Sequence, residues 1–99
     1  MPSKPPRSRR PAITARPATL ADLDVLVRFS AAMAKETEGR VLPLGRLRKG
    51  IRSVLESGEH GRYLVAESGA SVVGQLLLTY EWSDWRNGVF WWIQSVYVE

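Results

Sequence analysis

The feature that most constrains the fold is a change in hydrophobic periodicity after residue 58. Between residues 19 and 57 the apolar side chains recur every three or four positions, which is the spacing of an amphipathic helix. From residue 62 onward the chain is rich in β-branched and aromatic residues, and short turn-forming segments divide it. The sequence therefore predicts helices followed by strands, and we expect an α+β fold.

The first helix is predicted to begin at Thr19. The Thr19 hydroxyl can cap free backbone N–H groups, and Asp22 stands three residues later, as in a capping box with Asp in place of Glu. Gly39 supplies a stop at the other end. Six residues share one face of this helix: Leu20, Leu23, Leu26, Val27, Ser30 and Met33.

A second helix is predicted between Leu44 and the Ser57-Gly58 pair. Its apolar stripe consists of Leu44, Leu47, Ile51, Val54 and Leu55. Gly50 lies in the middle and costs roughly 1 kcal/mol relative to Ala in a helix interior. We therefore expect at Gly50 either a close contact with another element or a break into two short helices.

The strands are predicted from β-forming runs and the turns between them. Residues 13–16 form a first strand, because a residue that precedes Pro is pushed toward extended backbone. Residues 62–67, 72–82 and 89–98 form three more. Asn87-Gly88 is a strong hairpin signal, since both residues tolerate positive φ. The expected order is β-α-α-β-β-β, with the last three strands in an antiparallel meander.

Composition and charge exclude several classes of function. The chain has no Cys and a single His, His60, so we expect no metal site. No apolar run approaches the roughly 20 residues that span a bilayer, so we expect no membrane segment. Residues 1–16 carry a charge of +5, whereas residues 17–99 carry nine basic and ten acidic side chains. The folded part has no net basic field, and nucleic acid is not an expected partner.

The first 12 residues are expected to form a disordered, basic, Pro-rich tail, because they cannot bury enough apolar surface to offset the entropy of ordering. Arg9-Arg10 is not followed by the apolar stretch of an export signal, and we expect a cytoplasmic protein. Residues 13–99 are then one partial domain. The tail is expected to be a solvated extension, with contacts to RNA or anionic lipid as the alternative.

The ordered set of motifs resembles the GNAT superfamily of acetyl-CoA-dependent N-acetyltransferases. The resemblance begins with Arg16, Pro17-Ala18-Thr19 and Asp22 at the entry to the first helix. It continues with residues 63–67 and with the Val-x-Gly pattern of residues 72–74, and it ends with the alternating apolar residues 93–98. The resemblance covers residues 13–99 and implies the N-terminal half of a GNAT fold, with the two helices bordering the acceptor site.

The resemblance implies acetyl-CoA as cosubstrate and a primary amine, on a small molecule or a peptide, as acceptor. It also implies that backbone groups of Val96, Tyr97 and Val98 bind the pantetheine arm and the thioester carbonyl. In the family a Pro-x-x-Arg-x-x-Gly-x-Gly/Ala loop then binds the pyrophosphate. The sequence ends at Glu99, before such a loop, so we expect a fragment that is inactive as it stands.

Side chains for proton transfer are fewer. Glu81 is the candidate base, because the resemblance implies an acid near the end of its strand; a solvated edge residue is the alternative. Glu67 and Asp84 are weaker candidates, and Asp84 is expected to stabilise a turn. Tyr97 is considered as an acid for the leaving thiolate, although the Tyr usual in the family lies beyond residue 99. His60 is expected to be a solvated loop residue.

The aromatic and basic clusters have structural explanations. Trp91 and Trp92 are adjacent on a strand and face opposite sides, so we expect one in the core and the other as a cover or cleft wall. Stacking on nucleic acid or on an aromatic amine is the alternative for the four Trp. The basic residues of the second helix are expected to form a solvated face, with the acceptor cleft as the alternative: Arg46, Arg48, Lys49 and Arg52.

A second hypothesis comes from a different class of protein. Residues 89–98 would form a long apolar edge strand, which is a hazard unless something pairs with it. A non-catalytic α+β module that pairs through this strand, with a second copy as in a homodimer or with a partner chain, is the alternative to the enzyme.

Overall fold

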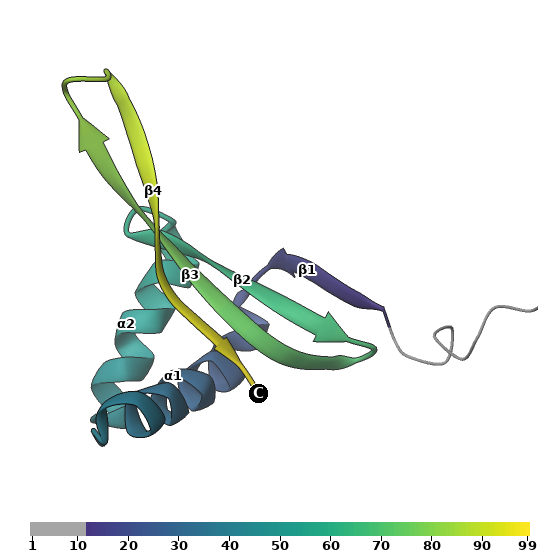
Figure 1. The fold of residues 1–99 in the computed structure, drawn as a ribbon. Helices are drawn as coiled ribbons and strands as arrows, with labels where there is room; N and C mark the ends of the chain where they lie inside the picture. The colour runs from purple at the N-terminus through teal and green to yellow at the C-terminus, as the bar shows by residue number, and fades with distance from the viewer. Residues whose placement is uncertain (1–11) are drawn as a thin grey trace, which may run out of the picture.

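The computed structural model describes residues 12–99 (Figure 1). The predicted tail, residues 1–12, lies outside this range except for Ala12. The elements are β1 (Ile13–Pro17), a short 3-10 turn η2 (Leu20–Asp22), α1 (Leu23–Glu38), α2 (Leu44–Ser57), β2 (Gly61–Ser68), β3 (Ser71–Ser83) and β4 (Gly88–Val98). The α+β class and the β-α-α-β-β-β order are confirmed.

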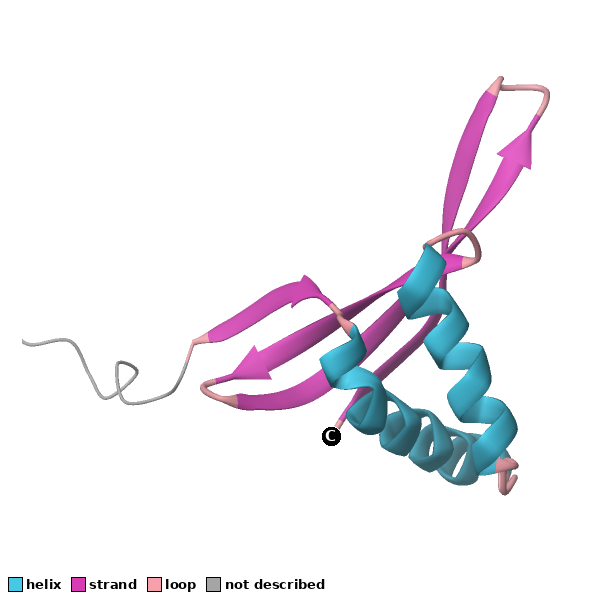
Figure 2. Cartoon of the chain, turned by 180° about the vertical axis from the view of Figure 1, so that it is seen from behind, coloured by secondary structure: helices cyan, strands magenta, loops and turns pink. Residues whose placement is uncertain are grey.

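The four strands form one antiparallel sheet in the order β1-β2-β3-β4. Both helices lie on the same face of this sheet (Figure 2). The core is the layer between them, and it joins both helices to β2 through five buried side chains: Leu23, Leu26, Ile51, Tyr63 and Val65. No helix of the described range covers the opposite face of the sheet.

The helix ends follow the sequence signals, whereas the buried face of α1 differs from the prediction. Gly39 and Gly58 end the two helices with φ of 65° and 69°, values that glycine adopts without strain. Leu20 is 48% exposed, although it is among the residues predicted for the buried face, whereas Phe29, which is not among them, is 1% exposed. The reason is that Leu20 belongs to the 3-10 turn, which precedes the α-helical stripe.

Neither expectation for Gly50 is met. α2 runs without interruption from Leu44 to Ser57, so the helix is not broken at Gly50. A Cβ atom added at Gly50 would meet nothing within 4 Å, so no neighbouring element requires a glycine there. The absence of a side chain at this position leaves open space beside α2.

The β3–β4 turn lies where it was predicted, but its geometry differs. Ser83 pairs with Gly88, so the connection is the four residues 84–87 and not a two-residue turn. Only Asn87 has a positive φ, at 49°, and its N–H donates to the Asp84 carbonyl at 3.3 Å. A longer loop of this kind needs a single left-handed residue, and Gly88 instead begins β4.

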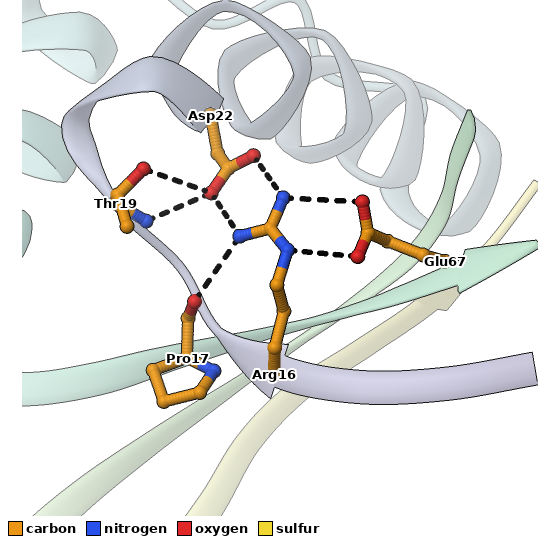
Figure 3. A network of polar contacts seen from close by, with 5 residues as sticks. All are labelled: Arg16, Pro17, Thr19, Asp22 and Glu67. Carbon is orange, nitrogen blue, oxygen red and sulfur yellow. Dashed lines mark hydrogen bonds and ion pairs between the residues drawn. The ribbon is translucent and has the colours of Figure 1, made fainter. Parts of the chain in front are cut away.

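Arg16 connects three elements through its guanidinium (Figure 3). It donates to both carboxylate oxygens of Asp22, at 2.8 and 2.9 Å, and to both of Glu67, at 2.9 and 3.4 Å. Asp22 is only 5% exposed, and its carboxylate also accepts the Thr19 N–H at 2.8 Å. This hydrogen bond is the half of the predicted capping box that the Asp side chain makes. The end of β1, the start of the helical layer and the end of β2 are therefore fixed to one another.

Replacing Asp22 tests how strongly this network stabilises the fold. Asp22→Ala removes the cap of Thr19 and leaves Arg16 with one carboxylate, so we expect the free energy of unfolding to fall by about 2–3 kcal/mol. Asp24→Ala is the matched control, because Asp24 pairs with Arg48 while its side chain is 85% exposed. That variant should lose less than about 1 kcal/mol in urea unfolding. Equal losses for the two variants would contradict this account.

The same carboxylate predicts a pH dependence of stability. The hydrogen bonds from Arg16 lower the pKa of Asp22 below its ordinary value of 3.8. Since the ionised form is favoured in the folded state, this contribution is complete above that ordinary value and is lost as the pH falls through the lower folded value. Urea midpoints measured between about pH 5 and pH 2 should therefore fall less steeply for Asp22→Asn than for the unaltered chain. Identical slopes would exclude the ionised Asp22 as a source of stability.

Candidate functional site

β4 is the longer of the two outer strands of the sheet, with 11 residues against 5 in β1, and its outer backbone groups are available to a ligand. It is the last strand of the sheet and pairs only with β3 within residues 12–99. Exposed large apolar side chains are concentrated on it: Val89, Phe90, Trp91, Trp92, Ile93, Val96 and Val98. An unpaired strand edge presents a row of N–H and C=O groups that can bind an extended chain.

The pairing register shows which backbone groups of β4 point away from β3. The Glu99 N–H donates to the Val73 carbonyl at 2.8 Å, and Tyr97 stands opposite Gln75. Because the direction alternates along an antiparallel strand, the backbone groups of Tyr97 face β3, whereas those of Val96 and Val98 face outward. Of the three residues predicted to bind the cofactor, two thus offer an open N–H and C=O.

A bulge in β4 precedes this segment and was not anticipated from the sequence. Leu77 pairs with Ser95 and Leu78 pairs with Ile93, so Gln94 is the additional residue. Its side-chain amide donates to the Thr79 hydroxyl at 2.8 Å. Bulges bend a strand and increase its twist, and β4 changes direction along its length in Figure 1. The bulge separates residues 95–98, which lie beside the helices, from the projecting hairpin.

The open face of the sheet carries a shallow hollow of about 240 Å³ beside Val96 and Val98. It is lined by residues of all four strands, and no charged side chain is among them. Gly74 forms part of its floor, and a Cβ atom there would lie 3.0 Å from the Tyr97 carbonyl oxygen. The glycine of the Val-x-Gly pattern therefore allows β3 and β4 to approach closely at this point.

The Tyr97 side chain points toward α1. Its ring lies 5.2 Å from that of Phe29, and its hydroxyl donates to Glu36 Oε1 at 3.3 Å. Partial burial, and then the Glu36 carboxylate, raise the pKa of the Tyr97 phenol. The phenol therefore stays protonated at neutral pH. Glu36 is a candidate that the sequence analysis missed, because no local motif shows that α1 ends beside β4.

The predicted proton-transfer residues do not gather at one place. Glu81 is exposed and stands opposite Phe90, five residues along β3 from Leu76, the partner of Val96. That separation is about 16 Å of strand. Glu67 is held by Arg16, and the Asp84 carbonyl closes the hairpin loop. His60 lies in the short connection between α2 and β2.

The expectation for the tryptophans is wrong in one respect. Trp91 and Trp92 are 53% and 51% exposed, so neither is a core residue within residues 12–99. The β3–β4 hairpin extends beyond the helices (Figure 1); β2 pairs with it only as far as Thr79, and the Tyr80 hydroxyl donates to the Gly58 carbonyl at 3.0 Å. Trp91 contacts Tyr80 edge-on at 4.6 Å, and Trp85 at the tip is 95% exposed.

The basic residues of α2 divide into two groups. Arg48 pairs with Asp24 and Arg52 with Glu56 on the exposed side of the helix, and Lys49 is exposed as well, which fits a solvated face. Arg46 is exposed too, but it also lines a second hollow, between α2 and β2.

Two classes of site find no support in the described range. Among residues 12–99 no three His, Cys, Asp or Glu side chains are grouped so that they could hold a metal ion. Within the same residues, no helix has the length and apolar character needed to cross a membrane.

Comparison with known proteins gives no match to a family model and none to a curated protein. Solved structures do match. A possible acetyltransferase from Clostridium difficile 630 is 48% identical, with a TM-score of 0.85, and the match covers 88% of this chain and 57% of that one. A GCN5-related N-acetyltransferase from Ralstonia eutropha JMP134 is 20% identical, with a TM-score of 0.70, over 89% and 63% of the two chains.

A predicted acetyltransferase with acetyl-CoA from Clostridium acetobutylicum is 16% identical, with a TM-score of 0.69, over 89% of this chain and 60% of that one. The two less similar structures support the fold alone, whereas the first also shares nearly half of its aligned residues. The chain spans less than two thirds of the length of each of these three proteins.

Proposed function

Since this chain has the fold of the N-terminal part of a GNAT acetyltransferase, we propose that it supplies the β4 side of an acetyl-CoA-dependent N-acetyltransferase site. The acceptor is a primary amine on a small molecule or a peptide. The observation that carries the proposal is the open backbone edge at Val96 and Val98, next to an uncharged hollow.

The residues of this edge fit the chemistry of the cosubstrate. Acetyl-CoA supplies an activated acetyl thioester on an extended arm that contains amide groups. The outward N–H and C=O groups of Val96 and Val98 can pair with such an arm as they would with another strand. A fixed backbone N–H near the thioester also stabilises negative charge that develops on the carbonyl oxygen. The hollow beside the edge has no charged residue in its lining and so suits the uncharged arm.

Two exposed carboxylates are candidates for the base that removes a proton from the amine. Glu81 lies on the projecting hairpin, about 16 Å along β3 from the partner of Val96, and serves an acceptor that binds along that hairpin. Glu36 lies closer to the edge, because it accepts the hydroxyl of Tyr97, the residue between Val96 and Val98. We therefore prefer Glu36 for an acceptor bound near the helices.

Cofactor binding can be measured on the 99-residue chain by following backbone amides in NMR spectra. On titration with acetyl-CoA, we expect the amide signals of Val96 and Val98 to shift more than that of Tyr97, which is bonded to β3. Val98→Pro removes one outward N–H and should weaken binding several-fold, the value of one neutral hydrogen bond. Val98→Ala keeps that N–H and is the matched control.

Two outcomes would count against the proposal. One is the absence of shifts at Val96 and Val98 at a concentration of acetyl-CoA that shifts other amides. The other is an equal loss of affinity in Val98→Pro and Val98→Ala, which would indicate that the side chain and not the backbone matters.

A second candidate is an interaction module in which two copies pair through β4. The exposure of seven large apolar residues on this strand favours it, because such an edge binds other strands readily. If β4 paired in antiparallel fashion with β4 of a second copy, the pairing would bond the same outward backbone N–H and C=O groups that the cofactor would use.

Because the two candidates compete for one edge, they give opposite results in size-exclusion chromatography with light scattering. For the enzyme we expect a monomer with and without acetyl-CoA. A dimer that acetyl-CoA does not dissociate would support the interaction module and contradict the enzyme proposal.

A further inference from the structure

A second hollow, of about 360 Å³, lies between α2, the segment that leads into it and β2. Its walls are apolar apart from one cation: Leu42, Pro43, Leu47, Ile51 and Tyr63 line it together with Arg46 and the backbone of Gly50. The volume falls within the range of small-molecule sites, which combine an apolar lining with a few polar groups.

Arg46 gives this hollow its charge preference. It is the only charged residue of the lining, and among residues 12–99 no carboxylate pairs with it. The nearby cations Arg48 and Arg52 are already paired, with Asp24 and Glu56. The first turn of α2 contains no acidic residue. An unpaired guanidinium beside an apolar wall fits a ligand that carries a carboxylate, which Arg binds with two parallel hydrogen bonds.

Gly50 keeps the hollow open. It lies one helical turn after Arg46 and three residues after Leu47, so all three share one face of α2. A Cβ atom added at Gly50 meets nothing within 4 Å. Any larger side chain would extend from this face into the hollow. A helix-interior glycine costs roughly 1 kcal/mol, and here its one structural consequence is the space beside Arg46.

The hollow is connected to the proposed cofactor edge by the sheet. Tyr63, which forms one wall, stands opposite Leu77 on β3, and Leu77 stands opposite Ser95 on β4. Two strand spacings amount to about 10 Å. Ser95 directly precedes Val96. A molecule roughly 10 Å long can therefore reach from the hollow toward the edge where the acetyl group would be held.

We propose that this hollow holds the apolar, carboxylate-bearing end of the acceptor, whose amine points toward β4. The inference rests on the proposed acetyltransferase function in one respect, because it identifies the ligand of the hollow as the acceptor. Binding of that ligand in the hollow does not require acetyl-CoA. It names the acceptor class as amines with an apolar body and a distant carboxylate.

Three compounds with one apolar body test the charge preference: 3-phenylpropionate, 3-phenylpropionamide and 3-phenylpropylamine. NMR titration of the 99-residue chain should show the carboxylate binding at least about tenfold more tightly than the amide or the amine, the value of a charged hydrogen bond. Nuclear Overhauser effects should join its ring protons to Ile51 and Tyr63. Equal affinity for the three compounds, or contacts at other residues, would overturn the proposal.

Variants of α2 test the position of the ligand. Arg46→Gln should lower the affinity for 3-phenylpropionate about tenfold, whereas Lys49→Gln, on the solvated face, should leave that affinity unchanged. Gly50→Leu should abolish binding by filling the hollow, and Gly50→Ala should retain most of it. If Gly50→Leu does not fold, the ring contacts in the unaltered chain decide the question. Unchanged affinity in a folded Gly50→Leu would overturn the proposal.

The same samples separate the two proposals. Failure of 3-phenylpropionate to bind while acetyl-CoA shifts Val96 and Val98 would overturn the acceptor site and leave the enzyme proposal standing. If 3-phenylpropionate binds at Arg46 while acetyl-CoA shifts other amides but not those of Val96 and Val98, the hollow is supported as a site and the enzyme proposal is overturned.

Discussion

The contact on which the rest of the structure depends is the guanidinium of Arg16 between Asp22 and Glu67. Asp22 is almost fully buried, and a buried carboxylate is tolerated only when its hydrogen bonds and its charge are satisfied. Arg16 supplies both, and Thr19 supplies one more N–H. The contact fixes β1 against β2 and sets the direction in which the helical layer leaves the sheet. The fourth strand then becomes the free edge, at the opposite end of the sheet from β1.

This arrangement makes the molecule asymmetric in two ways. The helices cover one face of the sheet and leave the other open, with an uncharged hollow on it, and of the two outer strands β4 has 11 residues whereas β1 has 5. Because backbone direction alternates along β4, the N–H and C=O groups of Val96 and Val98 face away from β3, whereas those of Tyr97 face β3. The Tyr97 side chain points toward α1. The two proposed binding regions lie on either side of this strand segment: the cofactor along its edge, and the acceptor on the helix side.

Much of the fold could be predicted because its signals are local. Asp22 stands three residues after Thr19, Gly39 and Gly58 end helices, and the β-forming runs give the strands. Leu20 was misplaced because a 3-10 turn and an α-helix have different periods, which composition does not distinguish. Trp91 and Trp92 are expected to divide between core and cover, yet burial depends on what packs against a strand, and both stay about half exposed where β2 begins, at the row of Trp92. The contact of Glu36 with Tyr97 and the bulge at Gln94 depend on how distant elements cross, and no short motif encodes either.

The central claim is that β4 presents an open backbone edge at Val96 and Val98, and amide hydrogen exchange tests it most directly. In the unliganded 99-residue chain, the amides of Val96 and Val98 should exchange at least about tenfold faster than that of Tyr97, because only Tyr97 is bonded to β3. Equal protection of the three amides would show that another strand already occupies the edge and would contradict the account.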